Sequence, residues 1–307
     1  MTAFPQLTRR AALVAGGAAP LAVASGAASA SDRARDGTGM RHHAFDLGEM
    51  AVTALLAATR VVEDPQSIFG MNVSAEEFAN VSAASFIPAD KARFYFNPTV
   101  VETGGETVLF DAGPSADGAL AVLAEAGYAP EDVDLVVLSH MHGDHIGGLM
   151  RQDAPAYPNA RYAIGQVEFD AWAGLGNDGF ETNVRPLADK TSFVGDGDAV
   201  APGIVAMAAF GHTPGHMAYM LDSGGMQALI MADTANHHVW SLAYPDWEVR
   251  FDMDKAAAAA TRRRVLGMLA TDRIPTLGYH MPFPGIGYVE TRGDGFRYTP
   301  ATYQLTL

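Results

Sequence analysis

Residues 138–150 read LSHMHGDHIGGLM, and this stretch holds four metal-ligand side chains within six positions: His140, His142, Asp144 and His145. Neutral imidazole and carboxylate are natural ligands for zinc and similar divalent metals. The preceding run, Val133–Leu138, is short and rich in β-branched residues, which predicts a buried strand. The four side chains therefore follow the carboxyl end of a strand, where α/β sheets place their binding sites. The stretch predicts a metal site.

Three later segments add residues of the same kinds where apolar runs end. A turn at residues 211–216 contains two histidines, the run 229–232 is followed by Asp233, and the run 274–279 is followed by His280. Because each polar residue comes where a strand is expected to stop, all of them can meet at one edge of a sheet.

The order of these motifs resembles the metallo-β-lactamase-fold hydrolase superfamily: H-x-H-x-D-H, then H-T-P-G-H, then a strand-terminal Asp and a late His. Within it, the chain most resembles the methyl parathion hydrolase and acyl-homoserine lactone lactonase group, from about Asn97 to the C-terminus. Other matching segments are LFDAG at 109–113, FPGIG at 283–287 and FRYTP at 296–300. The resemblance implies an α/β (α+β) fold, an αββα sandwich with two facing sheets and helices outside.

The resemblance also implies a binuclear centre for two divalent metal ions, which we expect to be Zn²⁺. The implied ligands of one metal are His140, His142 and His216. Those of the other are Asp144, His145 and His280, with Asp233 bridging the two. His212 is expected to support a ligand or stabilise the turn rather than bind metal, and His237 and His238 are expected in a solvated loop.

A bridging water between two metals would have a lowered pKa and supply hydroxide near neutral pH, with Asp144 and Asp233 as the catalytic carboxylates. The chain has no G-x-S-x-G motif for a serine nucleophile. We expect direct hydrolysis of a neutral hydrophobic ester, lactone or phosphotriester. Trp172 and Phe283 are expected to line an apolar substrate pocket.

Several alternatives stay open at this point. An acyl-homoserine lactone lactonase is the main one, although the tyrosine that such lactonases carry three residues after the bridging Asp is replaced here by Asn236. A β-lactamase or a thioesterase is a weaker alternative, and a non-enzymatic metal-binding protein is the weakest. The absence of cysteine excludes metal sites with a thiolate ligand and any disulfide.

The N-terminus predicts export. Thr8-Arg9-Arg10 precedes an uncharged Ala/Gly-rich stretch, and Ala28-Ser29-Ala30 fits a signal-peptide cleavage site. The paired arginine resembles a twin-arginine signal. The stretch is too weakly apolar for a stable membrane anchor. We expect a signal peptide at 1–30, a flexible lead-in at 31–43, a hydrolase domain at 44–307, and a periplasmic or secreted protein.

Charge limits the partners. The formal net charge is −15, from 20 basic and 35 acidic residues, which argues against nucleic acid because phosphate backbones require a basic surface. The expected partner is a small-molecule substrate, and a homodimer is a possible assembly. Among the regular elements, we expect one strand at 93–101, an irregular stretch from about 173 to 200, and a helix at 255–269.

Overall fold

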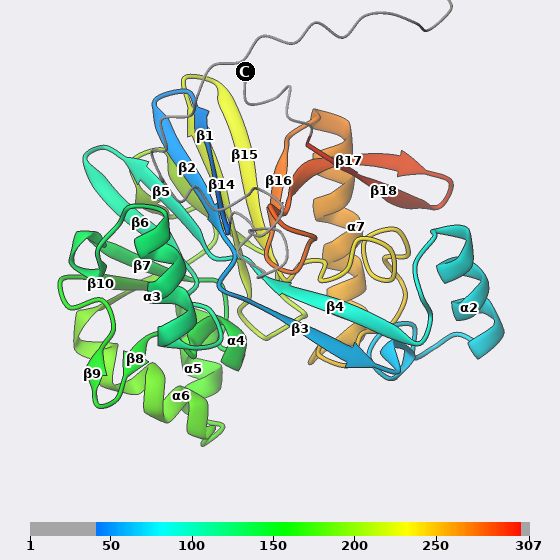
Figure 1. Ribbon diagram of the computed structural model, residues 1–307, viewed down its shortest axis with the longest axis horizontal. Coiled ribbons are helices and arrows are strands. Elements are labelled where there is room, and N and C mark those ends of the chain that lie inside the picture. The colour runs from blue at the N-terminus through cyan, green and yellow to red at the C-terminus, as the bar shows by residue number, and fades with distance from the viewer. Residues whose placement is uncertain (1–40, 302–307) are drawn as a thin grey trace, which may run out of the picture. The chain divides into compact units, whose positions relative to one another are not determined.

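The computed structural model describes residues 41–301, which form two seven-stranded sheets packed face to face (Figure 1). The first sheet has the order β1-β2-β5-β6-β7-β10-β11, with strands at His42–Leu47, Met50–Leu55, Thr99–Thr103, Glu106–Phe110, Leu135–Leu138, Arg161–Gly165 and Thr191–Val194. The second has the order β12-β13-β14-β15-β16-β17-β18, with strands at Ala199–Ala201, Ile204–Ala208, Met217–Ser223, Met226–Ala232, Thr276–Gly278, Ile286–Arg292 and Gly295–Pro300.

Both sheets mix parallel and antiparallel pairs. In the first, β6, β7, β10 and β11 are parallel neighbours and the other pairs are antiparallel. In the second, only β15 and β16 are parallel. These strands matter for function because the predicted ligands follow the carboxyl ends of β7, β15 and β16.

Helices cover the outer faces of both sheets. Their bounds are Ala75–Ala84 (α2), Ala116–Glu125 (α3), Gly143–Ile146 (α4), Gln166–Ala173 (α5), Asp178–Asn183 (α6) and Lys255–Asp272 (α7), with 3₁₀ turns at Pro65–Ser67, Pro130–Asp132 and Arg185–Lys190. One apolar core packs the helices α3, α4, α5 and α6 against the first sheet, and a second core fills the space between the two sheets. A third core packs α7 against the second sheet. This layering confirms the predicted αββα sandwich.

A two-stranded ribbon lies outside both sheets and was not anticipated. Strands β3 (Ala58–Glu63) and β4 (Lys91–Phe96) pair antiparallel, and α2 connects them through a loop. The ribbon packs with α2 against the segment that contains Trp240 and Trp247, in an aromatic cluster. The ribbon therefore has a core of its own. A short second ribbon pairs β8 (Met150–Arg151) with β9 (Ala154–Pro155).

Several predicted boundaries are corrected. The single strand expected at 93–101 is two strands, β4 and β5, which are interrupted at Asn97-Pro98. Proline cannot donate to a strand ladder. The Asn97 backbone N–H donates to the carbonyl of Tyr279 at 3.0 Å, and its side-chain amide donates to the carbonyl of Met281 at 2.8 Å. The stretch expected to be irregular contains α6, β11 and β12. His42 and His43, expected in the lead-in, begin β1.

The predicted signal peptide and most of the lead-in, residues 31–40, lie outside the described residues. Within residues 41–301, none of the helices has the length and apolar character needed to cross a membrane.

Candidate metal centre

The predicted ligands come from four separate segments that meet at one edge of the two sheets. His140 follows β7, and His142, Asp144 and His145 lie at or within the short helix α4. The two histidines of the 211–216 turn lie between β13 and β14, Asp233 directly follows β15, and His280 follows β16. The H-x-H-x-D-H loop is held close to the end of β6, where a Cβ on Gly148 would lie 1.9 Å from the carbonyl oxygen of Ala112. Only glycine fits there.

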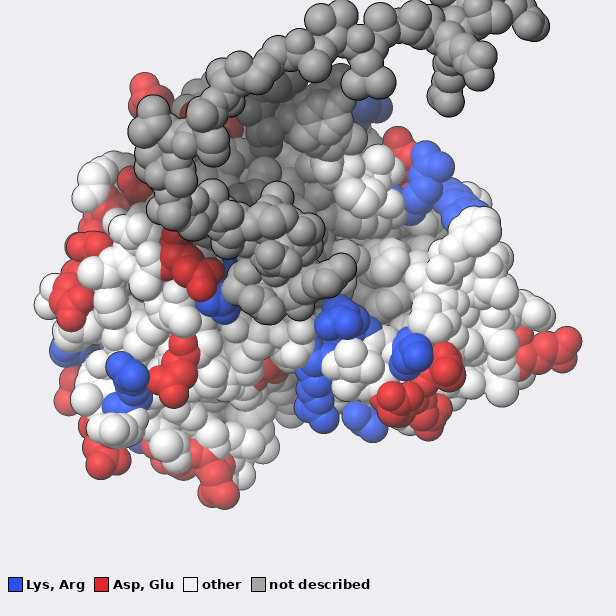
Figure 2. Space-filling view, viewed as in Figure 1, with Lys and Arg blue, Asp and Glu red and all other residues white. Residues whose placement is uncertain are grey.

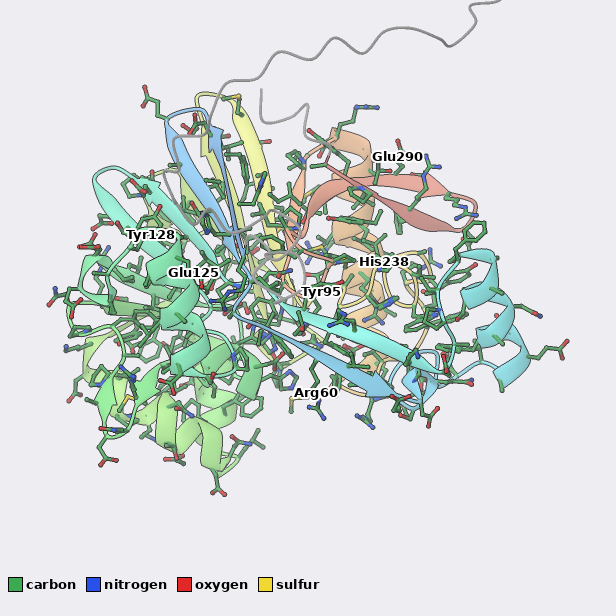
Figure 3. The ribbon with its side chains drawn as sticks, in the orientation of Figure 1. Arg60, Tyr95, Glu125, Tyr128, His238 and Glu290 are labelled. Atoms are coloured by element: carbon green, nitrogen blue, oxygen red, sulfur yellow. The ribbon has the colours of Figure 1, made fainter. Side chains whose placement is uncertain are left out.

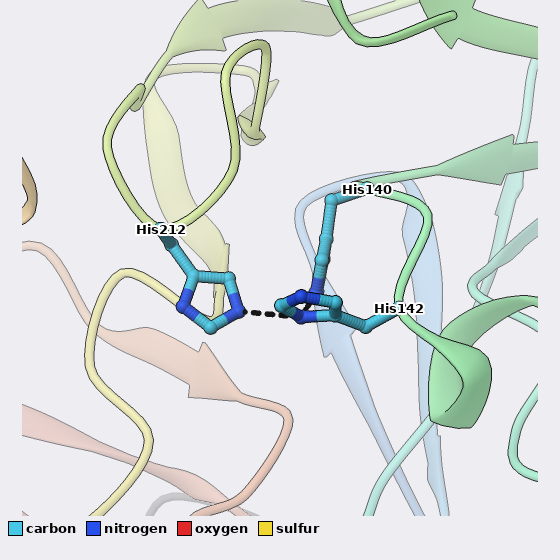
Figure 4. A group of neighbouring side chains, drawn as sticks. All are labelled: His140, His142 and His212. Atoms are coloured by element: carbon cyan, nitrogen blue, oxygen red, sulfur yellow. Dashed lines mark hydrogen bonds between the residues drawn. The ribbon is translucent and has the colours of Figure 1, made fainter. Parts of the chain in front are cut away.

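Three histidines form a group of facing ring nitrogens. Nε2 of His140 lies 3.0 Å from Nδ1 of His142, and the same Nδ1 lies 3.0 Å from Nε2 of His212 (Figure 4). His140 and His212 are buried, and His142 is partly buried. Three imidazole nitrogens directed at one point form the kind of donor set that a divalent metal binds.

Asp233 lies between this group and a second one. Its Oδ2 is 3.2 Å from Nε2 of His212 and 3.2 Å from Nε2 of His280, and its Oδ1 is 3.3 Å from Nε2 of His145. Asp144 completes the second group, with Oδ2 3.2 Å from Nε2 of His280. One carboxylate thus contacts histidines of both groups, as a bridging ligand would.

The 211–216 turn differs from the prediction. His216 was expected as a ligand, but Nδ1 of His216 lies 3.1 Å from the carbonyl oxygen of Ala209 and its Nε2 accepts the Asp233 backbone N–H at 3.1 Å. Both ring nitrogens are therefore used inside the fold, and none faces the cluster. His212, expected in a supporting role, takes the place predicted for His216. Both histidines lie on one turn, so their spacing in the sequence gave no basis for choosing between them.

A buried network orients His145. The Asp111 carboxylate lies 2.9 Å from Nδ1 of His145 and accepts hydrogen bonds from the backbone N–H and hydroxyl of Ser139. With Nδ1 engaged, Nε2 of His145 is directed toward Asp233. Partners of this kind fix the tautomer and direction of a ligating histidine. Asp111 stands in the LFDAG segment, but the sequence did not reveal its role.

Two further carboxylates support the ligand loops and were also missed. Asp252 lies 2.9 Å from Nδ1 of His212 and accepts a hydrogen bond at 2.7 Å from the buried Arg262. Glu168 accepts hydrogen bonds from the Met141 N–H at 3.0 Å and the Gly215 N–H at 2.8 Å, which ties the two histidine loops together. Arg262 is itself only 1% exposed, so this arginine of α7 belongs to the buried network.

Burial and charge divide the histidines into two classes. Burial and neighbouring histidines hold the pKa of His140 well below its usual value, and lower the pKa of His142 to about 3. Burial also opposes protonation of His212 and His280, but carboxylates outweigh it. Asp233 and Asp252 raise the pKa of His212 to about 9, and Asp233 with Asp144 raises the pKa of His280 to about 10.

The site fits two divalent cations. Nε2 of His145 and Oδ1 of Asp233 are buried without a hydrogen-bond partner among the described residues, although they lie only 3.3 Å apart. Each such unpaired polar atom is costly unless something binds it. The facing nitrogens of His140, His142 and His212 lie close enough together to bind one cation. Cations between these atoms would satisfy all of them.

A cavity of about 700 Å³ opens onto these residues. Its apolar wall consists of Ile68, Phe94, Phe96 and Phe251, and its polar lining includes His142, Asp144, Asp233 and His280. Phe94 and Phe96 contact the His280 ring edge-on, at 5.4 and 5.5 Å between centroids. The aromatic side chains therefore reach the ligands directly.

The two aromatic residues predicted for this wall lie elsewhere. Trp172 is buried in the core under α5, where its ring meets His142 edge-on at 5.7 Å, and Phe283 packs against the core between the sheets. Neither lines the cavity. Two of the wall residues, Phe94 and Phe96, come from β4 of the β3–β4 ribbon, whose presence the sequence analysis missed, and Ile68 and Phe251 come from the neighbouring loops. His237 is buried rather than solvated, and His238 is partly buried.

Comparison with known proteins supports this picture. Residues 94–276 match the family model of the metallo-beta-lactamase superfamily. An N-acyl homoserine lactonase of Bacillus cereus is 29% identical over 107 residues, which are 35% of this chain and 40% of that protein. The anti-Pycsar protein Apyc1 of a Paenibacillus strain is 41% identical over 59 residues, 19% of this chain and 23% of that protein. The chain thus spans about two fifths or less of these curated relatives.

Solved structures agree on the fold. The dizinc quorum-quenching lactonase AidC superposes with a TM-score of 0.78 at 24% identity, covering 85% of this chain and 97% of that one. The hydrolase AbOPH superposes with a TM-score of 0.79 at 22% identity, covering 86% and 98%. With the family model spanning more than half of the sequence, the chain belongs to the metallo-beta-lactamase superfamily.

Proposed function

We propose that this protein is a hydrolase that depends on two divalent cations, most naturally zinc, and cleaves an ester or lactone with an apolar acyl part. The observation that carries the proposal is the position of Asp233, whose carboxylate contacts His145, His212 and His280 at the floor of an aromatic cavity. Bound there, two cations would supply a water of lowered pKa and a Lewis acid for the scissile oxygen.

In this proposal the ligands fall into the two groups that the geometry defines. One cation would be held by His140, His142 and His212, and the other by Asp144, His145 and His280, with Asp233 shared. The backbone carbonyl of Tyr95 lies 2.8 Å from Nδ1 of His280 and directs its Nε2 toward the two carboxylates. Asp111 contacts Nδ1 of His145 and Asp252 contacts Nδ1 of His212, and these contacts fix the directions of the two rings. Each ring thus has its direction set before a cation arrives.

The cavity wall selects the substrate in this proposal. Phe94, Phe96 and Ile68 would pack along an acyl chain or aryl group and exclude water from the reacting carbonyl. The relatives named above include N-acyl homoserine lactonases, which makes lactones the first alternative within the ester class. Asn236 is buried and does not line the cavity, so the role that such lactonases give to a tyrosine has no counterpart at this position.

A substrate panel tests the proposal. Initial rates would be measured for zinc-loaded and chelator-treated protein on an acyl-homoserine lactone, a γ-lactone, an aryl ester, an aryl phosphotriester, a thioester and a β-lactam. We expect metal-dependent turnover of the ester or a lactone. If only the phosphotriester, the thioester or the β-lactam were turned over, the proposed substrate class would be wrong.

A matched pair of variants separates the metal centre from general effects. Asp233→Asn should lower turnover at least about a hundredfold, whereas Asp222→Asn should not, because Asp222 is an exposed carboxylate that accepts hydrogen bonds within its own hairpin. Metal-independent turnover that survives Asp233→Asn would reject the proposal as a whole.

A further inference from the structure

Two arginines line the cavity above the candidate metal centre. Arg60 belongs to β3, and Arg250 precedes α7; both are exposed. Among residues 41–301, neither has a carboxylate within ion-pair distance, although Arg41, Arg161, Arg185 and Arg262 each have one. The side chains of Arg60 and Arg250 are therefore available to a ligand in the cavity.

The register of the β3–β4 ribbon decides which residues face the cavity. Arg60 pairs with Phe94, and cross-strand partners share one face of a ribbon. Arg93, by contrast, pairs with Val61, and these two line a second cavity of about 290 Å³ on the other face, which shares only His280 with the first. Lys91 lies with them. Figure 2 shows basic side chains over this ribbon, with acidic side chains beside them at its end toward α2, and Figure 3 labels Arg60 on β3.

Contacts between aromatic rings place the arginines one layer above the ligands. Phe94 meets His280 at 5.4 Å between ring centroids, and it also meets Phe251 at 6.3 Å. The guanidinium of Arg250 lies over the Phe251 ring, 5.2 Å from its centroid. The cavity therefore passes from buried ligands, through a layer of phenylalanines, to two exposed positive charges.

Charge makes this arrangement selective. The chain carries a formal net charge of −15, which repels anions in general. The carboxylates in the cavity lining are Asp144 and Asp233, which belong to the candidate metal centre. A substrate that extends out of the aromatic layer meets guanidinium groups, and these bind carboxylates with paired N–H donors.

We infer that the preferred substrate carries a carboxylate at the end distal to the scissile bond, separated from it by an apolar segment, and that Arg60 and Arg250 are the specificity-determining residues that bind this carboxylate. The inference rests on the proposed function and refines its substrate from an ester or lactone with an apolar acyl part to one with a carboxylate at the far end of that part.

The test compares matched esters. The mono-4-nitrophenyl ester of octanedioic acid and its methyl-capped diester have the same chain and leaving group but differ by one charge. We expect a higher kcat/KM for the acid than for the diester, and we expect this difference to come from a lower KM. Adding 0.5 M salt should reduce the preference, because screening weakens contacts between charges. Arg60→Gln and Arg250→Gln should each lower the acid-to-neutral ratio of kcat/KM roughly three- to tenfold, through a higher KM for the acid.

Arg93→Gln is the control, since it removes the same charge from the same ribbon but from the opposite face. An equal loss of preference in Arg93→Gln, or a wild-type preference for the neutral diester, would overturn the inference while leaving the hydrolase proposal intact.

A binding measurement covers the case in which neither ester is hydrolysed, which would count against the proposed function. Suberanilic acid and octananilide are the corresponding amides with and without the carboxylate. Calorimetry on the metal-loaded protein should show tighter binding of the acid, weakened by Arg60→Gln and Arg250→Gln but not by Arg93→Gln. Equal affinity for both amides would overturn the inference independently of catalysis.

Discussion

Oδ1 of Asp252 lies 2.9 Å from Nδ1 of His212, and this contact determines which histidine of the 211–216 turn faces the metal centre. With Nδ1 engaged, Nε2 of His212 is directed toward His142 and Asp233. Asp252 is held in turn by Arg262, at 2.7 Å. A candidate ligand is thus positioned by a carboxylate 40 residues away in the sequence.

Asp252→Asn should weaken metal binding roughly 10- to 100-fold, because it removes the charge that orients His212. Asp246→Asn is the matched control: Asp246 also pairs with an arginine of α7, Arg263, but contacts none of the ligands. Metal affinity would be measured by competition with a chromophoric chelator. Equal affinities in the two variants would show that Asp252 only stabilises α7.

His212→Ala and His216→Ala should separate ligand from scaffold. We expect His212→Ala to lose one bound metal per chain by elemental analysis. His216→Ala should keep both metals but lower the free energy of unfolding by about 1–3 kcal/mol, since it leaves the Asp233 N–H and the Ala209 carbonyl unpaired. The reverse pattern would restore His216 as the ligand.

Asp233→Asn should lower kcat by at least about a hundredfold on the best substrate of the panel. The amide keeps the shape of the side chain but loses the charge that contacts both groups of histidines, through His212 in one and His280 in the other. The fold should survive, as circular dichroism would show. A variant with wild-type kcat and unchanged metal content would make Asp233 a turn residue.

Metal binding should release protons at neutral pH. In the metal-free protein the pKa of His212 is raised to about 9 and that of His280 to about 10, so both are protonated at pH 7. A cation must displace these protons, so its affinity should rise with pH until the pH passes these values. Titration calorimetry at pH 7 in buffers of different ionisation enthalpy would count the protons. A heat independent of buffer would contradict the prediction.

We also propose export through a twin-arginine signal at residues 1–30. Replacing Arg9 and Arg10 by lysine should retain the precursor in the cytoplasm, because that route requires the arginine pair. Cell fractionation with an antibody against the folded domain would measure this. Mature protein at its normal level in the exported fraction of the variant would exclude the twin-arginine route.

Much of the centre could be predicted from short stretches of sequence. His140, His142, Asp144 and His145 lie within six residues after an apolar strand, and this spacing alone brings them together. Asp233 and His280 could be predicted because each ends a recognisable strand at the same edge. The sandwich followed from the alternation of strands and helices, together with the family resemblance.

The cavity wall could not be predicted in this way. The ribbon pairs Arg60 with Phe94, 34 residues further along the chain, and neither of its strands belongs to the two main sheets. Trp172 and Phe283 were plausible wall residues by position, but packing places both in cores. The sequence does not show whether an apolar side chain points into a core or into a cavity, so only the packed structure shows which of them face the cavity.

The sequence by itself determined the kind and order of the ligands, because those depend on residue type and on spacing within single loops. Tertiary structure decided the choice between His212 and His216, because the direction of an imidazole depends on what its second nitrogen contacts. In His212 that partner is Asp252, from a distant segment; in His216 both nitrogens are taken by the backbone. It also decided that Arg60 and Arg250 share one cavity, since 190 residues separate them and only folding brings their charges together.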